Sequence, residues 1–551
     1  MAASTAGRAP AYDADVLVLG GGPAGAWAAL AAARAGASVV LADKGFCGTS
    51  GATASGGNNL WYVPPEPAAR EESIRRYEKA GGMITDRSWM ARTLELTWNQ
   101  VGQLADWGYP FPTDFYGQVR RSSLQGPEYM RLMRLQVKRA GVTILDQSPA
   151  LELLTDADGV VSGARGTRRQ HGDETWEVRA GAVILATGGC AFLSGALGCN
   201  PDTGDGHLMA AELGAELSGM EFSGVFGMAP AFGAQTKGRM YQFARYYRAD
   251  GTPVGIPEGL GTRPDIARAA MDGPVFARLE LAPPSIHEHL RWAQPNFFLP
   301  FDKAGADPFT DLFEVRFVLE GTVRGTGGIV LSGDGCETSA PGLYAAGDAA
   351  TRELITGSRS GGGSHNGAWA MSSGTIAGRA AATFARRDVA AARELRSAAR
   401  AGIPDTGTAT GSAALSPDEV ITNVQAEVLT PAKCLFRTAV SLRESLSRLD
   451  EIWADQVPRL GSDRGRQKAR EAAALAAHAR WMYRSALARP ESRGIHRRED
   501  HPDTDPALTL RLRTGGLDEV WVRQETLLTQ ETPLAEGSPL AEQTPVSEGA
   551  R

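Results

Sequence analysis

A glycine-rich segment directly after a short apolar run is the feature that most constrains this fold. Residues 15–20 read DVLVLG, which is typical of a strand buried on both faces, and an Ala-rich stretch that ends at Gly36 predicts a helix after it. Gly20, Gly22 and Gly25 have G-x-G-x-x-G spacing. The first glycine allows a sharp turn, the second lets amides reach a pyrophosphate, and the third lets the helix pack on its strand. The segment therefore predicts a dinucleotide-binding site.

A second apolar run, ASVVLAD, ends at Asp43, which follows Gly20 by 23 positions. An acidic side chain at this distance from the glycines accepts hydrogen bonds from a ribose hydroxyl. These residues predict a dinucleotide but do not distinguish NAD from FAD.

The size and composition of the chain limit the function classes. At 551 residues the chain is long enough for several domains, and 42 % hydrophobic and 22 % charged residues are ordinary for a globular protein. The formal net charge is −6 and no basic block appears, so we expect no nucleic-acid partner. We find no apolar run long enough for a bilayer and no secretory leader, so we expect no membrane insertion and a cytoplasmic location.

The five cysteines are scattered and never form a C-x-x-C pair, so we expect neither a disulfide framework nor an internal metal or iron–sulfur site. Electrons that the chain handles would then leave to an external acceptor.

Several later segments identify the cofactor by resemblance. Lys44 begins KGFCGTSGATASGGNN, AVILATGG covers 182–189, TGDG covers 203–206, and APGLYAAGDAA and GSRSGGGSHNG follow within 340–367. The segment ESRGIHRREDHP stands at 491–502. In this order the segments resemble the flavoproteins of the succinate dehydrogenase and fumarate reductase family, with L-aspartate oxidase and the alpha subunit of adenylylsulfate reductase as relatives.

The resemblance implies an α/β fold, with a Rossmann-like FAD-binding domain, an inserted α+β capping domain and a C-terminal helical domain. It places the FAD-binding domain at 1–225 and 331–400 and the cap at 226–330. A linker and the helical domain follow at 401–523. The composition of residues 524–551 predicts a disordered tail.

The resemblance and the glycine motif together give the expected FAD contacts. They are Gly20, Gly22, Pro23, Ala24, Gly25, Asp43, Lys44, Ser50, Gly51, Thr53, Gly56, Gly57, Ala186, Thr187, Gly188, Asp205, Gly347, Asp348, Gly363 and Ser364. For Asp205 a purely structural role as a carboxylate at a helix start stays open.

Three residues differ from the family pattern, and they limit the expected flavin linkage and substrate. Ser50 stands where respiratory members carry the histidine that bonds FAD covalently, so the resemblance implies noncovalent FAD. Phe226 and Val323 stand where two substrate histidines are implied, and no histidine lies between His289 and His365. We therefore expect a substrate other than succinate or fumarate.

Three residues are the catalytic candidates. The resemblance implies that Arg359 binds a substrate carboxylate, with a structural ion pair as the alternative. Arg324, in the loop GTVRGTGG, could complete a carboxylate clamp because guanidinium fits two oxygens, or it could be a solvated loop residue. His365 could contact flavin or substrate, or bond to backbone at a helix start.

We expect an FAD-dependent oxidoreductase that exchanges a hydride between flavin N5 and a small anionic substrate. Two alternatives stay open, namely a subunit that passes electrons to a separate iron–sulfur protein and a flavin-binding protein without catalysis. The aromatic stretch at 238–255 is either a wall of the substrate pocket or the core of the cap.

Overall fold

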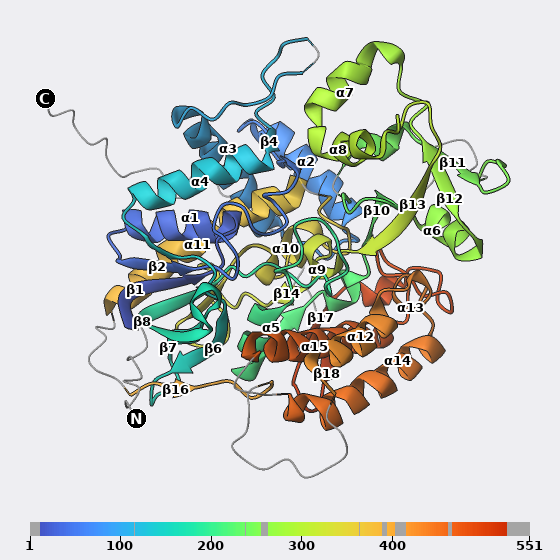
Figure 1. Cartoon of the computed structure of the whole chain (residues 1–551). Helices are drawn as coiled ribbons and strands as arrows, with labels where there is room; N and C mark the ends of the chain where they lie inside the picture. The colour runs from blue at the N-terminus through green and yellow to red at the C-terminus, as the bar shows by residue number, and fades with distance from the viewer. Residues whose placement is uncertain are drawn as a thin grey trace, which may run out of the picture.

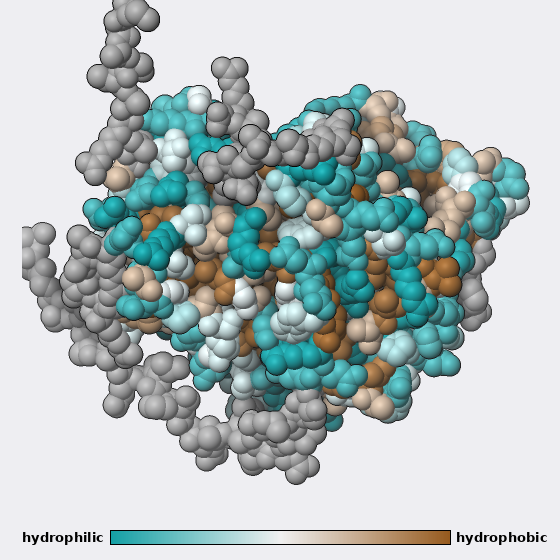
Figure 2. All heavy atoms as spheres, turned by 90° about the horizontal axis from the view of Figure 1, so that it is seen from below, coloured by the Kyte–Doolittle hydropathy of each residue, from teal (hydrophilic) through white to brown (hydrophobic). Residues whose placement is uncertain are grey.

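The computed structural model describes residues 11–114, 116–236, 238–254, 263–362, 364–387, 394–402, 415–460 and 465–525. Three regions are visible in Figure 1: a sheet domain covered by long helices, a cap built around β10–β13, and a C-terminal region around α15. This is the mixed α/β architecture that the sequence predicts. Figure 2 shows a mostly hydrophilic face, with smaller groups of hydrophobic residues between the polar ones.

The central sheet of the described residues has eight strands and joins a parallel part to an antiparallel part. The order is β16-β6-β7-β8-β1-β2-β5, with β15 paired to β8. The bounds are β1 (Ala11–Leu19), β2 (Val39–Ala42), β5 (Thr143–Leu145), β6 (Ala150–Thr155), β7 (Val161–Arg168), β8 (Glu174–Leu185), β15 (Leu343–Ala345) and β16 (Arg396–Ser397). Strands β6, β7 and β8 pair in an antiparallel way, and β8 continues without a break into the parallel part of the sheet, where it pairs with β1.

Strand register brings distant segments to one edge of this sheet. Leu19 lies beside Ala42 on β2 and beside Leu185 on β8, and all three strands are parallel. Ala345 of β15 also pairs with Leu185. The residues that follow these four strands therefore meet at the carboxyl edge, where open α/β sheets bind ligands.

Two helices in direct contact cover this sheet, α1 (Pro23–Arg34) and α11 (Ser364–Arg387). A Cβ on Gly374 would lie 2.2 Å from the Ala24 carbonyl oxygen, and one on Gly378 would lie 2.2 Å from that of Ala28. Only glycine allows the two helix backbones to come this close. The helices therefore lie side by side and run in the same direction. Around them lie α2 (Pro67–Ala80), α3 (Arg87–Asp106), α4 (Gly126–Arg139), α5 (Asp205–Glu212), α10 (Glu353–Thr356), β3 (Gly57–Asn59) and β4 (Ser123–Gln125).

The cap is an antiparallel sheet with its own apolar core. Its strands are β10 (Phe226–Pro230), β13 (Phe313–Leu319), β12 (Val275–Arg278) and β11 (Arg245–Arg248), in that order. Its helices are α6 (Arg263–Asp272), α7 (His287–Ala293) and α8 (Pro295–Ala304). The chain leaves this sheet at Leu319, before the predicted boundary at 330, because the following segment packs on the sheet domain as α9 (Gly321–Arg324) and β14 (Gly328–Ile329).

The C-terminal region contains the predicted helices and also a strand pair. The helices are α12 (Pro417–Val428), α13 (Pro431–Cys434), α14 (Ala439–Glu451) and α15 (Arg466–Ala488). The hairpin β17 (Arg511–Gly515) and β18 (Trp521–Glu525) joins β14 and β9 (Leu217–Ser218) in one sheet. Strand β18 thus extends past the predicted start of the tail at 524, and residues 526–551 lie outside the described residues.

Buried ion pairs fasten α15 and the segment after it to the sheet domain. Arg470 binds Glu212 through two contacts of 2.5 and 2.7 Å, and both side chains are almost fully buried. Arg489 binds Glu221 and Glu491 at 2.8 Å each. Removing one partner of such a pair leaves an uncompensated buried charge, so these contacts fix how the regions sit together. Among the described helices, none has both the length and the apolarity needed to cross a bilayer.

Two buried histidines lie in the same junction, and they predict acid sensitivity. His207 of α5 and His478 of α15 have ring centroids 5.0 Å apart. Burial lowers the pKa of His207 to about 4 and lowers the pKa of His478 well below its usual value. The unfolded chain binds these protons more readily, so stability is fully present above pH 6.5 and is lost as pH falls toward 4.

We predict that His207→Leu reduces this loss. Between pH 7.5 and pH 4.5 the free energy of unfolding should fall by about 2–3 kcal/mol less in the variant, since each pKa unit is worth about 1.4 kcal/mol. Urea unfolding at both pH values measures the difference. His501→Gln, at an exposed position, is the control and should match the parent protein. An unchanged pH dependence in His207→Leu would contradict the assignment.

Candidate active site

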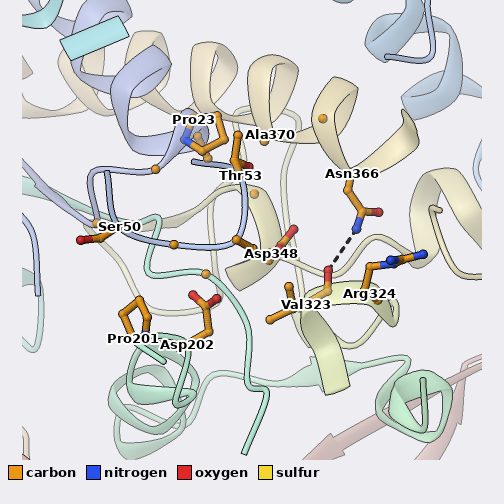
Figure 3. Close-up of a pocket in the computed structure, with 18 of the residues that line it drawn as sticks. Pro23, Ser50, Thr53, Pro201, Asp202, Val323, Arg324, Asp348, Asn366 and Ala370 are labelled. Carbon is orange, nitrogen blue, oxygen red and sulfur yellow. Dashed lines mark hydrogen bonds between the residues drawn. The ribbon is translucent and has the colours of Figure 1, made fainter. Parts of the chain in front are cut away.

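A cavity of about 440 Å³ lies between the carboxyl edge of the central sheet and the cap. Figure 3 shows part of its lining, with Asp202, Asp348, Asn366 and Arg324 among the labelled side chains. Most of the predicted cofactor contacts line this cavity. They are Gly20, Gly22, Pro23, Ala24, Asp43, Lys44, Ser50, Gly51, Thr53, Gly57, Ala186, Thr187, Gly188, Asp205, Gly347 and Asp348.

Four predicted contacts do not line the cavity or cannot be placed. Gly25 packs inside the turn, the Gly56 carbonyl accepts a hydrogen bond from the Gly126 amide, and the Ser364 carbonyl accepts one from the Trp61 amide. Gly363 lies outside the described residues.

The turn between β1 and α1 has the geometry that its glycines predict. Gly20 has a φ of +105°, and a Cβ there would lie 2.2 Å from the Ala186 carbonyl oxygen. A Cβ on Gly25 would lie 1.8 Å from the Gly20 carbonyl oxygen. Any larger side chain at either position would push the helix away from the sheet.

The cavity has room and donors for a dinucleotide beside α1. Gly22, Gly51 and Gly362 line it, and a Cβ on any of them would meet no atom within 4 Å. The first turn of α1 has no acidic residue and no side-chain cap. Its unpaired amides and positive helix end are suited to the pyrophosphate of FAD.

Asp43 and Lys44 connect this turn to neighbouring segments. The Asp43 carboxylate accepts hydrogen bonds from the amides of Gly21 at 2.5 Å and Gly45 at 2.7 Å. Burial raises the pKa of Asp43, and these two amides partly offset that effect. Lys44 binds Asp205 and Glu471 at 2.7 Å each, so Asp205 also has a structural partner.

Ser50 lies at the cavity in a loop that its own side chain stabilises. Its Oγ accepts a hydrogen bond of 2.6 Å from the Phe46 amide. The loop then continues through Gly51, whose φ is +88°, to β3. A hydroxyl group held by backbone in this way offers no nitrogen for a covalent bond to FAD.

Sequence reasoning missed two polar residues next to the predicted ones. Asp202 is buried and lines the cavity, and a Cβ on Gly188 would lie 2.4 Å from its Oδ1. Asn366 donates a hydrogen bond of 3.0 Å from Nδ2 to the Val323 carbonyl (Figure 3). The N-P-D-T-G-D-G segment offers two aspartates, and spacing alone did not distinguish them.

Of the three catalytic candidates, only Arg324 lines the cavity. It ends α9, and its Nη1 lies 3.3 Å from Glu320 Oε2. Glu320 is fully buried and also accepts a hydrogen bond of 2.8 Å from Thr236 Oγ1. The Arg324 Nε is buried without a hydrogen-bond partner among the described residues. The side chain is therefore oriented by Glu320 but keeps donor capacity for a ligand.

Arg359 and His365 are not among the residues that line this cavity. Arg359 is exposed, with its guanidinium 5.8 Å from the Tyr77 ring centroid. His365 is buried between Trp61 and Tyr77, with ring centroids 4.6 and 4.2 Å away. Burial lowers the pKa of His365 to about 4, so its ring is neutral at pH 7.

The cap supplies the rest of the cavity wall. Met228, Tyr241, Tyr246 and Ile266 line it and also belong to the cap core. Arg239, Gln242 and Gln294 are the polar cap residues of the lining. The two interpretations of the aromatic stretch at 238–255 therefore both hold for Tyr241 and Tyr246.

Comparison with known proteins agrees with this geometry. Residues 15–228 match the FAD binding domain family, and residues 426–537 match the fumarate reductase flavoprotein C-terminal family. L-Aspartate oxidase of Streptomyces coelicolor is 26 % identical over 90 % of both chains. A fumarate reductase (CoM/CoB) chain of Methanothermobacter marburgensis is 25 % identical over 90 % of this chain and 96 % of its own.

Urocanate reductase of Eggerthella lenta is 30 % identical over 42 % of each chain. Among solved structures, E. coli quinol fumarate reductase superposes with a TM-score of 0.75 and 20 % identity, covering 96 % of this chain and 99 % of that one. Adenylylsulfate reductase of Archaeoglobus fulgidus has a TM-score of 0.73 and 19 % identity, covering 95 % and 97 %. Both structures share the fold. One family is indicated by the two family matches, by the relatives that align over nearly the whole chain, and by the cavity that the predicted FAD contacts line. We conclude that the chain belongs to the succinate dehydrogenase and fumarate reductase flavoprotein family and is an FAD-dependent oxidoreductase.

Proposed function

We propose that the protein exchanges a hydride between FAD and a carbon atom of a small carboxylate-bearing substrate, and that Arg324 binds the carboxylate. The observation that carries this proposal is the position of Arg324 in the cavity, between the residues suited to FAD and the cap. When bound, FAD supplies the two-electron acceptor or donor. The names of the relatives support this substrate class, since aspartate, fumarate and urocanate are all carboxylates.

The partners of Arg324 fit it for binding an anion. Glu320 occupies one Nη1 contact, while the buried Nε has no partner among the described residues. The Nε is itself enclosed by protein atoms, so a substrate carboxylate would bind the outer guanidinium nitrogens of this partly exposed side chain through charge-assisted hydrogen bonds. Thr236 holds the second oxygen of Glu320, so it is a positioning residue for Arg324.

The reaction needs a place for one proton besides the hydride. In the oxidative direction a substrate C–H bond breaks and its two electrons leave with the hydride, while the neighbouring carbon or nitrogen loses a proton. Arg324 and Glu320 are in contact, so the pair can take up this proton or return it in the reductive direction. His365 lies outside the cavity lining, and we assign it no role in this step.

The substrate that we propose is neither succinate nor fumarate. Phe226, at the position of an implied substrate histidine, is buried in β10 and has no polar group for a second carboxylate. An iron–sulfur partner and a role without catalysis stay alternative predictions. If the isolated chain oxidises or reduces its flavin when a substrate is added, the role without catalysis is wrong.

We predict that Arg324→Ala weakens carboxylate binding roughly 10- to 100-fold, because it removes a hydrogen bond between charged groups. Titration of the FAD-loaded protein with propionate, followed by the change in flavin absorbance, measures the affinity. Arg359→Ala is the matched control, since it also removes one arginine, and its affinity should stay within about twofold of the parent. If Arg359→Ala weakens propionate binding and Arg324→Ala does not, then Arg359 and not Arg324 binds the carboxylate.

We also predict that FAD is bound without a covalent link. Acid precipitation of the holoprotein should release all of the flavin into the supernatant, and Ser50→Ala should behave identically, because neither side chain offers a nitrogen for a covalent link to FAD. Flavin fluorescence that stays with the denatured polypeptide on a gel would contradict this prediction.

A further inference from the structure

Resting on the proposed function, we infer that the substrate is an organic carboxylate with a planar apolar body of about one ring, and not a short dicarboxylate. The inference comes from the cap side of the cavity, which the FAD contacts do not use. A substrate that reaches Arg324 from the cap would pass along this surface.

The wall on the cap side has a rigid apolar part beside the polar residues Arg239, Gln242 and Gln294. Met228, Tyr241, Tyr246 and Ile266 line the cavity, and each is at most 7 % exposed. The Tyr241 ring packs edge-on against Phe297, with centroids 5.5 Å apart, and the Tyr246 hydroxyl donates to the Tyr241 carbonyl at 3.4 Å. Both rings are therefore fixed before a ligand arrives, so that a planar group can pack on them at little entropic cost.

Strand β10 contributes Met228 to this apolar surface, whereas Phe226 is buried outside the cavity lining. Phe226 and Met228 of β10 are two residues apart, so they face the same side of the strand. Gly227 faces the other side, where a Cβ would lie 2.6 Å from Glu320 Oε2. Strand β10 thus leaves room for the Glu320 side chain on one face, while Met228 on the other face lines the cavity.

The positions of the cations decide where a carboxylate can bind. Among the residues that line the cavity in the described part of the chain, the cations are Lys44, Arg239 and Arg324. Lys44 is held by Asp205 and Glu471, and Arg239 is exposed. Arg324 is the partly buried cation of the substrate end, with a side chain that is 13 % exposed. One carboxylate contact at Arg324, together with the apolar residues of the cap, suits an amphipathic monocarboxylate.

Three ligands that differ by one group test the inference. All three contain the same two-carbon chain with a carboxylate at one end. Propionate has no further group, 3-phenylpropionate has a phenyl ring at the other end, and succinate has a second carboxylate there. Titration of the FAD-loaded protein, followed by flavin absorbance, gives the three affinities. We expect 3-phenylpropionate to bind at least about tenfold more tightly than either propionate or succinate, because its ring is removed from water against the tyrosines.

Neighbouring tyrosines on β11 supply a matched pair of variants. Tyr246 lines the cavity, whereas Tyr247 does not and donates its hydroxyl to Glu280 at 2.7 Å. Tyr246→Ala should remove most of the preference for 3-phenylpropionate over propionate, and Tyr247→Ala should keep it. Ile266→Ala, a smaller change in the same wall, should reduce the preference if Tyr246→Ala fails to fold. FAD content and melting temperature check the fold of each variant.

Each outcome separates the inference from the proposed function. If succinate binds as tightly as 3-phenylpropionate, or if Tyr246→Ala and Tyr247→Ala have the same effect, the inferred substrate class is wrong while carboxylate binding stands. Tighter binding of AMP than of 3-phenylpropionate would also overturn it, in favour of a nucleotide. If none of the three carboxylates perturbs the flavin of a protein that retains FAD, the proposed function itself fails.

Discussion

The close contact between α1 and α11 is the constraint on which the site depends. Gly374 and Gly378 let the second helix lie directly on the backbone of the first at Ala24 and Ala28. The two helices run in the same direction, and Gly22 and Gly362, which precede them, both line the cavity. A larger side chain at the contact would separate the helix ends and widen the space between them. The amides that face the cavity are therefore set by packing between segments that lie far apart in the sequence.

A buried arginine connects the cofactor side of the cavity to the substrate side. Arg352 is fully buried, pairs with Asp348, and donates to the carbonyls of Thr322 at 2.6 Å and Val323 at 3.2 Å. Asp348 lines the cavity near the expected flavin, and Val323 precedes Arg324. Arg352 thus fixes the distance between these two segments. The family resemblance did not draw attention to it, because its role depends on burial and on carbonyl groups that no motif encodes.

Much of the cofactor site could be predicted because it depends on backbone geometry at glycine-rich turns. The roles of Gly20, Gly22 and Gly25 follow from spacing alone, and the structure has them. The substrate side was harder to predict, because it depends on which way side chains point after the cap folds. Arg359 precedes a glycine cluster in the sequence, yet its side chain is exposed. The sequence spacing also could not show that Tyr241 and Tyr246 line the cavity.

The central claim is that a carboxylate substrate binds Arg324 in the space between FAD and the cap. A crystal structure of the FAD-loaded protein with 3-phenylpropionate tests this claim most directly. The account predicts carboxylate oxygens within about 3 Å of the Arg324 guanidinium, a ring against Tyr241 and Tyr246, and Arg359 in solvent. A carboxylate bound by Arg359, with Arg324 still paired only to Glu320, would contradict it.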